Sequence, residues 1–291
     1  MQVVYHLGAH STDEERLVKT LMRNASTLAE QGIAVPAPMR YRMVLRDALV
    51  SLKGAEAPPE EQARILSTVT DMASPERLIF SHEFFLCIPQ RVVTSNGFYT
   101  MAASKLQPLA NLFPQARPEF CMGLINPATL IPALIDRIDG ASYDSVMGRV
   151  DPATLRWGPI VAEMRAAFPD APLVLWCNED TPLIWPEVLR RIAGVAPTMA
   201  LEGDYAILAT IMSADGLERL KSYLAKHPPS SAGQRRKIVT AFLDKFALTD
   251  KLEVELNLPG WTQELVEEIS ANYDADIAAI AAMPGVEFIA P

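Results

Sequence analysis

Four short, nearly continuous apolar runs alternate with longer segments of helical spacing, and this alternation leaves few architectures open. The runs lie at Val3–Leu7, Leu78–Ser81, Phe120–Ile125 and Leu173–Cys177. Apolar runs of this length are typical of strands that are covered on both faces. Strands of this kind that alternate with helices form a parallel sheet between two helical layers. The sequence therefore predicts a three-layer α/β fold with a mostly parallel central sheet.

Apolar spacing and caps mark the helices between the runs. The first helix is expected from residue 17 to Gly32, because leucines recur on one stripe and glycine favours the position after a helix. Asn126-Pro127 and Asp151-Pro152 each join a capping side chain to a first-turn proline, so each predicts a helix start. Further helices are expected over Trp185–Ala193, Ser231–Phe246 and residues 262–282.

The 291 residues are enough to bury a large core without disulfides or metals. No internal repeat, low-complexity tract or linker divides the sequence. We therefore expect a single domain over residues 1–291, with helical insertions at about residues 40–73 and 201–256.

Composition restricts the partners and the compartment. The net charge is −9, from 26 basic and 35 acidic residues, and an acidic surface repels nucleic acid. No apolar stretch approaches the ~20 residues that cross a bilayer, and the opening residues do not resemble a secretory signal. Cys87, Cys121 and Cys177 form no CxxC pair, which indicates buried free thiols. These features predict a cytoplasmic protein without nucleic-acid or membrane partners.

The loop after the first run, from Gly8 to Glu15, leads directly into the first helix. Phosphate-binding loops occur in this strand–loop–helix context, because backbone N–H groups at a helix start attract anions. Gly8 fits the first glycine of GxxxxGK[ST], but Asp13, Glu14 and Glu15 stand where Gly, Lys and Ser or Thr belong. The context thus favours an anion site, whereas the side chains do not.

Four segments resemble bacterial sulfotransferase-like proteins and occur in the same order. They are YHLGAHSTDEERLVKTLMRNASTLAEQGIAVP, INPATLIPAL, LVLWCNEDTPLIWPEVL and the tail ANYDADIAAIAAMPGVEFIAP. The resemblance spans nearly the whole chain. It implies a P-loop-type sulfotransferase fold and transfer of a sulfuryl group from 3′-phosphoadenosine 5′-phosphosulfate (PAPS) to a hydroxyl acceptor, such as a small molecule or a carbohydrate.

The same resemblance assigns donor-binding positions. It places the cofactor near Gly8, His10, Ser11, Thr12 and Asn126. However, the family's loop lysine corresponds to Ser11. Its 3′-phosphate clamp, an arginine and a serine, corresponds to Ile125 and Ala133. Both donor anchors are therefore degenerate, and PAPS is implied by the resemblance alone.

The acidic loop also fits a role in the fold. Ser11 with Glu14, and Thr12 with Glu15, have capping-box spacing, and the carboxylates at residues 13–15 complement the helix dipole. We expect this capped helix, in which carboxylates occupy the place of a phosphate, over an anion-binding loop.

His82 and Glu83 directly follow the second run and are the candidate general bases if sulfuryl transfer occurs. A structural role at the strand end is the alternative. His6, His10 and His82 with neighbouring carboxylates would form a mixed metal site only in a weaker hypothesis, and no metal ligand is assigned.

Two other polar groups have competing interpretations. Glu179 and Asp180 would orient an acceptor or, as we prefer, fix a loop or cap a helix. The basic run at residues 234–237 would form a replacement anion site or, preferably, a solvated helix face. Three functions remain open: a PAPS-dependent sulfotransferase, a non-catalytic binding or regulatory pseudoenzyme, and a metal-assisted enzyme. The acceptor and the oligomeric state stay open as well.

Overall fold

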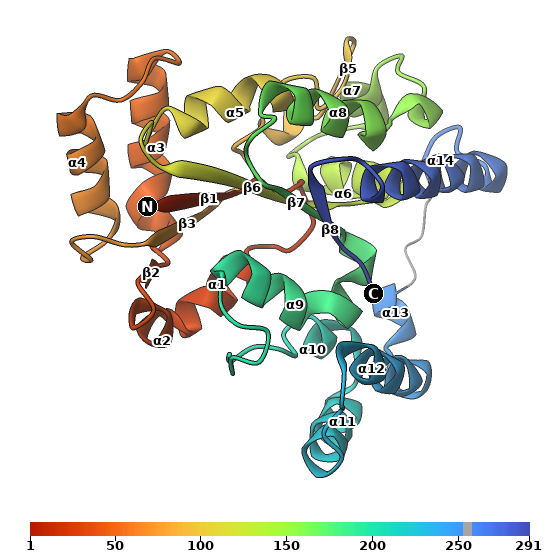
Figure 1. Cartoon of the computed structure of the whole chain (residues 1–291). Helices are drawn as coiled ribbons and strands as arrows, with labels where there is room; N and C mark the ends of the chain where they lie inside the picture. The colour runs from red at the N-terminus through yellow and green to blue at the C-terminus, as the bar shows by residue number, and fades with distance from the viewer. Residues whose placement is uncertain (253–257) are drawn as a thin grey trace.

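The computed structural model describes residues 1–252 and 258–291, and a six-stranded sheet lies at its centre (Figure 1). The strand order is β2-β3-β1-β6-β7-β8, and every pairing in this sheet is parallel. The strands are β1 (Gln2–His6), β2 (Ile33–Ala34), β3 (Arg77–Ser81), β6 (Arg117–Leu124), β7 (Leu173–Cys177) and β8 (Val286–Ile289). The predicted α/β fold with a mostly parallel sheet is confirmed.

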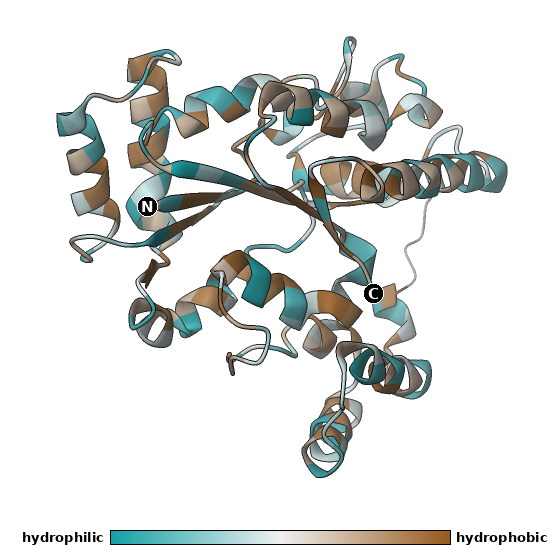
Figure 2. Cartoon of the chain, viewed as in Figure 1, coloured by the Kyte–Doolittle hydropathy of each residue, from teal (hydrophilic) through white to brown (hydrophobic). Residues whose placement is uncertain are grey.

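Both faces of the sheet are buried, which explains why the strands have continuous apolar sequences. Along β1, Val3 and Tyr5 join the hydrophobic cluster on one face, whereas Val4 joins the cluster on the other. Neighbouring strands alternate in the same way, because successive side chains of a strand point to opposite faces. In Figure 2 the middle strands are accordingly coloured as hydrophobic.

Two layers of helices cover the sheet (Figure 1). One layer packs its apolar residues into the cluster of Val4 and consists of α1 (Arg16–Arg23), α2 (Ala25–Ala29) and α9 (Thr181–Ala193). The other packs into the cluster of Tyr5 and consists of α3 (Pro38–Leu52), α4 (Pro59–Val69), α5 (Ala102–Ala110), α6 (Pro127–Arg137), α7 (Tyr143–Met147), α8 (Trp157–Ala167) and α14 (Gln263–Ala281). The expected helices at Asn126-Pro127 and at residues 262–282 are both present.

Three helix predictions need correction. The first helix is interrupted at Asn24, whose side chain bonds the backbone of Thr20 and Glu202 and so ties the break to a distant segment. Asp151-Pro152 begins only the three-residue 3-10 turn η2 (Pro152–Thr154), and α8 starts at Trp157. The predicted helix at Trp185 starts four residues earlier, at Thr181.

The two insertions are helical. The first contains α3 and α4, which pack on each other. The second contains α10 (Leu208–Ile211), α11 (Ala214–Lys226), α12 (Ala232–Phe246) and α13 (Thr249–Leu252). The end of the predicted segment, residues 253–256, lies outside the described part of the chain. This second insertion has its own small apolar cluster around Leu220 and Val239.

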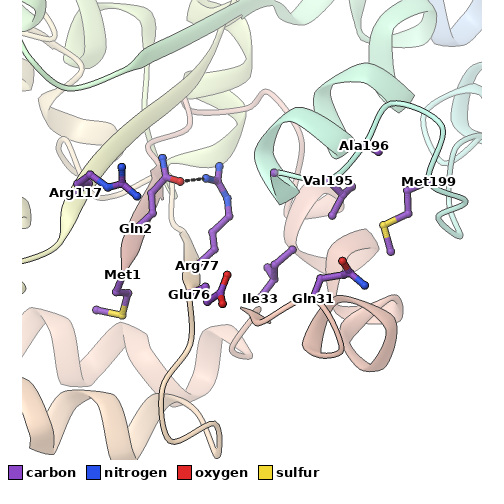
Figure 3. A pocket seen from close by; sticks show the side chains of 11 residues that line it. Met1, Gln2, Gln31, Ile33, Glu76, Arg77, Arg117, Val195, Ala196 and Met199 are labelled. Atoms are coloured by element: carbon purple, nitrogen blue, oxygen red, sulfur yellow. Dashed lines mark hydrogen bonds between the residues drawn. The ribbon is translucent and has the colours of Figure 1, made fainter.

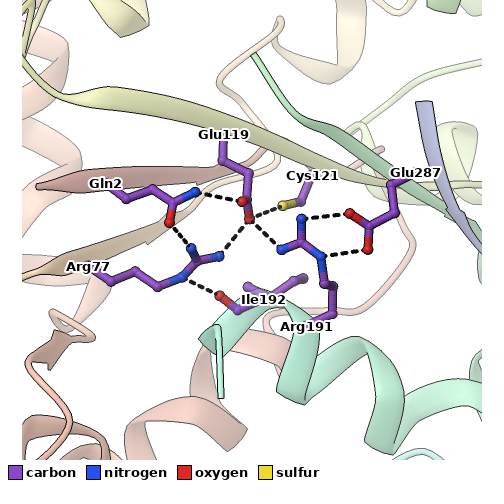
Figure 4. Close-up of polar contacts among 7 residues, drawn as sticks. All are labelled: Gln2, Arg77, Glu119, Cys121, Arg191, Ile192 and Glu287. Atoms are coloured by element: carbon purple, nitrogen blue, oxygen red, sulfur yellow. Dashed lines mark hydrogen bonds and ion pairs between the residues drawn. The ribbon is translucent and has the colours of Figure 1, made fainter. Parts of the chain in front are cut away.

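A buried polar network lies on the α9 side of the sheet (Figure 4). The Glu119 carboxylate on β6 accepts hydrogen bonds from Gln2 on β1, Arg77 on β3 and Arg191 on α9. Arg191 also binds the Glu287 carboxylate on β8 through two hydrogen bonds. The network therefore links four strands to the helix that covers them.

A polar hollow of about 760 Å³ opens beside this network, at the amino-terminal edge of the sheet (Figure 3). Its lining includes Gln2, Arg77 and Met199. Gln2 and Arg77 bind each other here, and the hollow lies opposite the edge where ligands of parallel sheets bind.

Cys87, Cys121 and Cys177 are buried and free, as expected from their spacing. Within residues 1–252 and 258–291, no helix combines the length and the apolar character that crossing a bilayer requires.

Candidate functional site

The predicted site residues lie at the carboxyl edge of the sheet, around the ends of β1, β3, β6 and β7. The chain leaves β1 toward β2 but leaves β6 toward β7, so the ends of the neighbouring strands β1 and β6 form a topological switch point. Ligands of open parallel sheets bind in the crevice at such a point. The loops at Gly8–Glu15 and Ile125–Asn126 flank it.

Close packing and unusual backbone angles fix the loop after β1. Gly8 has φ of 89°, and a Cβ at this position would lie 2.9 Å from the Cα of Glu83. Ser11, Glu14 and Glu15 also have positive φ, at 58°, 47° and 66°. Residues other than glycine adopt this left-handed conformation at a cost, and such strain clusters at ligand-binding and switch regions.

The first helix is capped by Asp13 and not by the predicted capping boxes. α1 begins at Arg16, and the Asp13 carboxylate accepts hydrogen bonds from the N–H groups of Leu17 (2.9 Å) and Glu15 (3.3 Å). The Thr12 hydroxyl instead donates to the carbonyl of Ala9. The left-handed turn at residues 14 and 15 places the earlier carboxylate over the helix start. A carboxylate nevertheless occupies the place of an anion, as the capped-helix interpretation expects.

The other two loop carboxylates also have partners. Glu14 pairs with Arg16. Glu15 pairs with Arg42 on α3 and with Lys19 on α1. The hydrogen bond from Arg42 is the main reason why the pKa of Glu15 is lowered. The acidic side chains of the loop are therefore held by groups of the same chain.

Glu14→Gly should give a more stable protein than Glu14→Ala, by about 1 kcal/mol in the free energy of unfolding. Both variants lose the Arg16 ion pair, which is exposed and worth little. Only glycine removes the Cβ that opposes a φ of 47°. Urea unfolding of the two variants measures the difference. Alanine as the more stable variant would contradict the strain at this position, since alanine wins at ordinary helical positions.

Three of the expected cofactor-binding residues are engaged inside the protein. His10 is fully buried, and its backbone N–H and Nδ1 lie 3.0 and 2.7 Å from the Tyr99 hydroxyl. The side-chain oxygen of Asn126 caps α6 at Ala128, and its amide donates to Ser270. Thr12 is bound within the loop. Gly8 and Ser11 contribute backbone geometry, through their positive φ.

The two positions that correspond to the family's 3′-phosphate clamp lie directly after β6 and within α6. Ile125 is 5% exposed and belongs to the apolar core, and its carbonyl accepts a hydrogen bond from the Trp157 indole N–H. Ala133 lies within α6. An arginine at position 125 would bury a charge among apolar side chains, which is costly without a partner.

The candidate bases flank an aromatic cluster at the end of β3. Phe84 stacks on His10 (centroids 5.5 Å apart) and contacts His82 (5.0 Å), and the Arg137 guanidinium lies over its ring. Glu83 pairs with this same Arg137. Burial raises the pKa of Glu83, and Arg137 opposes that rise.

The three histidines at this edge are neutral at pH 7. Burial lowers the pKa of both His10 and His82 to about 4, with Arg137 and Arg42 respectively adding to the effect. Burial also lowers the pKa of His6, which stacks on Trp176. Nδ1 of His82 is buried without a hydrogen-bond partner among the described residues, as are Nε2 of His6 and Nε2 of His10. Glu83, in contrast, is held by Arg137.

The metal hypothesis gains no support from these positions. Across the described ranges 1–252 and 258–291, no group of three or more His, Cys, Asp or Glu side chains is arranged to hold a metal ion.

The remaining polar groups hold elements together. Glu179 accepts hydrogen bonds from the Asn126 N–H (2.8 Å) and the Tyr273 hydroxyl (2.9 Å), and so fixes the starts of η3 (Asn178–Asp180) and α6 to α14, as the loop-fixing interpretation expects. Arg235 and Arg236, predicted on a solvated face, instead contact α9 through Leu183 and Glu187. Their sequence run gave no sign of this packing.

Comparison with known proteins gives no family. No family model matches the sequence, and no curated protein matches it.

Proposed function

We propose that this chain is a non-catalytic relative of the sulfotransferase-like proteins, a binding protein that no longer takes the PAPS donor. The Asp13 carboxylate carries this proposal, because it occupies the N–H groups at the start of α1 where the donor's 5′-phosphosulfate would bind. The sequence resemblance supports the ancestry. The parallel sheet, with its loop at the switch point after β1, is compatible with it.

Energetics also favour loss of the donor. A hydrogen bond to a charged group contributes roughly 1.5–3 kcal/mol, and the expected lysine and arginine are absent at Ser11 and Ile125. A carboxylate at the helix start adds repulsion against a polyanion. Because Ile125 is buried, replacing it by arginine would not by itself restore the 3′-phosphate clamp.

The unaltered protein should show no thermal stabilisation by 1 mM 3′-phosphoadenosine 5′-phosphate (PAP), the spent donor. A site with a Kd of about 10 μM would gain about 2.7 kcal/mol under these conditions, which a thermal melt detects easily. A PAP-dependent rise in Tm of the unaltered chain would disprove the proposal.

A loop variant provides the positive arm of this experiment. Ser11→Lys/Asp13→Gly restores the cation and opens the helix start, so its Tm should rise with PAP even though the lost cap lowers its basal stability. Ser26→Lys/Glu30→Gly changes the net charge equally at exposed positions of α2 and its end, away from the loop, and should not respond. Equal PAP-dependent rises in Tm of the two variants would show that the response depends on net charge and not on the loop.

A catalytic role is the second candidate, and it is favoured by the position of His82 in the lining of a cavity at this edge of the sheet. In this alternative His82 removes the proton of a hydroxyl acceptor. Transfer of a labelled sulfuryl group from PAPS to a hydroxyl acceptor, lost in His82→Gln, would establish it.

A further inference from the structure

A cavity of about 1020 Å³ lies beside the candidate site, between α3, α5 and the segment that follows β3. Its floor is apolar and includes the buried side chains of Leu45, Phe85, Leu86 and Leu109. His82 and Arg42 also line it, so the cavity is next to the loop after β1. Its size is at the upper end of small-molecule sites.

The rim of this cavity is cationic in an acidic protein. Five cations line it, namely Arg42, Arg46, Lys53, Arg91 and Lys105, and no Asp or Glu is among the described residues of the lining. Arg42 pairs with Glu15. The other four form no ion pair within the described residues. Because the whole chain has a net charge of −9, the local sign is reversed here.

Exposed apolar side chains gather at the same place. Of the eight large hydrophobic residues with high exposure in the described chain, four line this cavity: Met43, Val50, Phe84 and Ile88. On α3, Arg42, Arg46 and Leu49 recur at helical spacing and line the cavity, as does Lys53, the residue that directly follows the helix. One helix face thus presents both cations and apolar carbon to the same space.

We propose that this cavity binds a monomeric amphiphilic anion, such as a medium-length alkyl chain that carries a carboxylate or a similar anionic head. The chain would cover the apolar floor, and the head would bind unpaired cations of the rim, such as Arg46 on α3 and Lys105 on α5. The inference rests on the proposed function, since it names the ligand class of a binding protein. A polar nucleotide would leave the floor uncovered, and a neutral lipid would leave the cations unpaired.

Dodecanoate below its micellar concentration is the probe, and isothermal titration calorimetry of the full chain is the measurement. We expect saturable 1:1 binding. Octanoate should bind on the order of 100-fold more weakly, because each buried CH₂ contributes about fourfold in affinity. Dodecyltrimethylammonium, with the same chain and the opposite charge, should not bind. Equal binding of both dodecyl compounds would overturn the proposal.

Two double variants test the position of the site. Arg46→Ala/Lys105→Ala should weaken dodecanoate binding about tenfold. Arg23→Ala/Lys237→Ala removes the same charge from exposed positions on α1 and α12 and should bind as the unaltered protein does. Equal affinities of the two variants, or binding to phosphatidylglycerol vesicles without binding to monomeric dodecanoate, would overturn the assignment.

The two proposals fail separately. A response to PAP disproves the loss of the donor and leaves the dodecanoate result untouched. If dodecanoate does not bind and PAP does not raise the Tm, the proposed amphiphilic ligand is wrong, whereas the proposed loss of PAPS binding is still supported.

Discussion

Replacing Glu119 by alanine is expected to lower the free energy of unfolding by about 3–5 kcal/mol. Glu119 is 2% exposed, and its Oε1 accepts hydrogen bonds from Arg77 at 2.6 Å and Arg191 at 3.0 Å. Its Oε2 accepts one from Gln2 at 2.8 Å. Alanine would leave the buried Arg77 guanidinium without its carboxylate, and uncompensated buried charge is among the most costly changes in a core.

Glu287→Ala is the matched control for this prediction. Glu287 binds Arg191 through two hydrogen bonds, but its side chain is 49% exposed, so its loss should cost no more than about 1 kcal/mol. Urea unfolding of both variants at pH 7 gives the comparison. A cost below about 1.5 kcal/mol for Glu119→Ala would show that the network contributes little net stability and that its groups re-pair when one is removed.

The Glu119 network also shows what local sequence reveals and what it hides. The four apolar runs correctly predicted β1, β3, β6 and β7, because burial on both faces selects apolar residues at every position. Arg117 and Glu119 at the start of β6 were left out of the predicted strand, because Arg117 is exposed and the buried Glu119 is paired by arginines that are distant in sequence. β2, with two residues, and β8, with an exposed Glu287, gave no comparable pattern.

The candidate site divides along the same line. The loop after β1 and the carboxylate at the helix start could be predicted, because both depend on residues close in sequence. The capping residue was wrong, because the positive φ of Glu14 and Glu15 moves the cap to Asp13, and side chains other than glycine give no signal of such angles. The pairing of Arg42 with Glu15 and the cationic cavity depend on contacts across the chain.

Acidification from pH 7 to pH 4.5 is expected to lower the free energy of unfolding by several kcal/mol. Burial holds the pKa of His10 and His82 at about 4, against 6.5 for an ordinary histidine. Between these values the unfolded chain binds more protons than the folded chain, so stability falls as the pH falls through this window. At 1.36 kcal/mol per pKa unit, each histidine contributes up to about 3 kcal/mol. His6, whose pKa is also lowered, acts in the same direction.

Buried carboxyl groups oppose this trend in part. Burial raises the pKa of Glu83, Glu179 and Asp180, so these groups take up protons more readily in the folded state and offset some of the loss on acidification.

His82→Phe removes one titrating group from the aromatic cluster around Phe84 and should reduce the slope of stability against pH by up to about 1.4 kcal/mol per pH unit. His227→Gln, which changes an exposed histidine on the second insertion, is the matched single-substitution control. Urea unfolding at pH 7, 5.5 and 4.5 measures all three proteins. If His82→Phe loses stability on acidification as steeply as the unaltered chain, the pKa of His82 is not lowered in the folded protein.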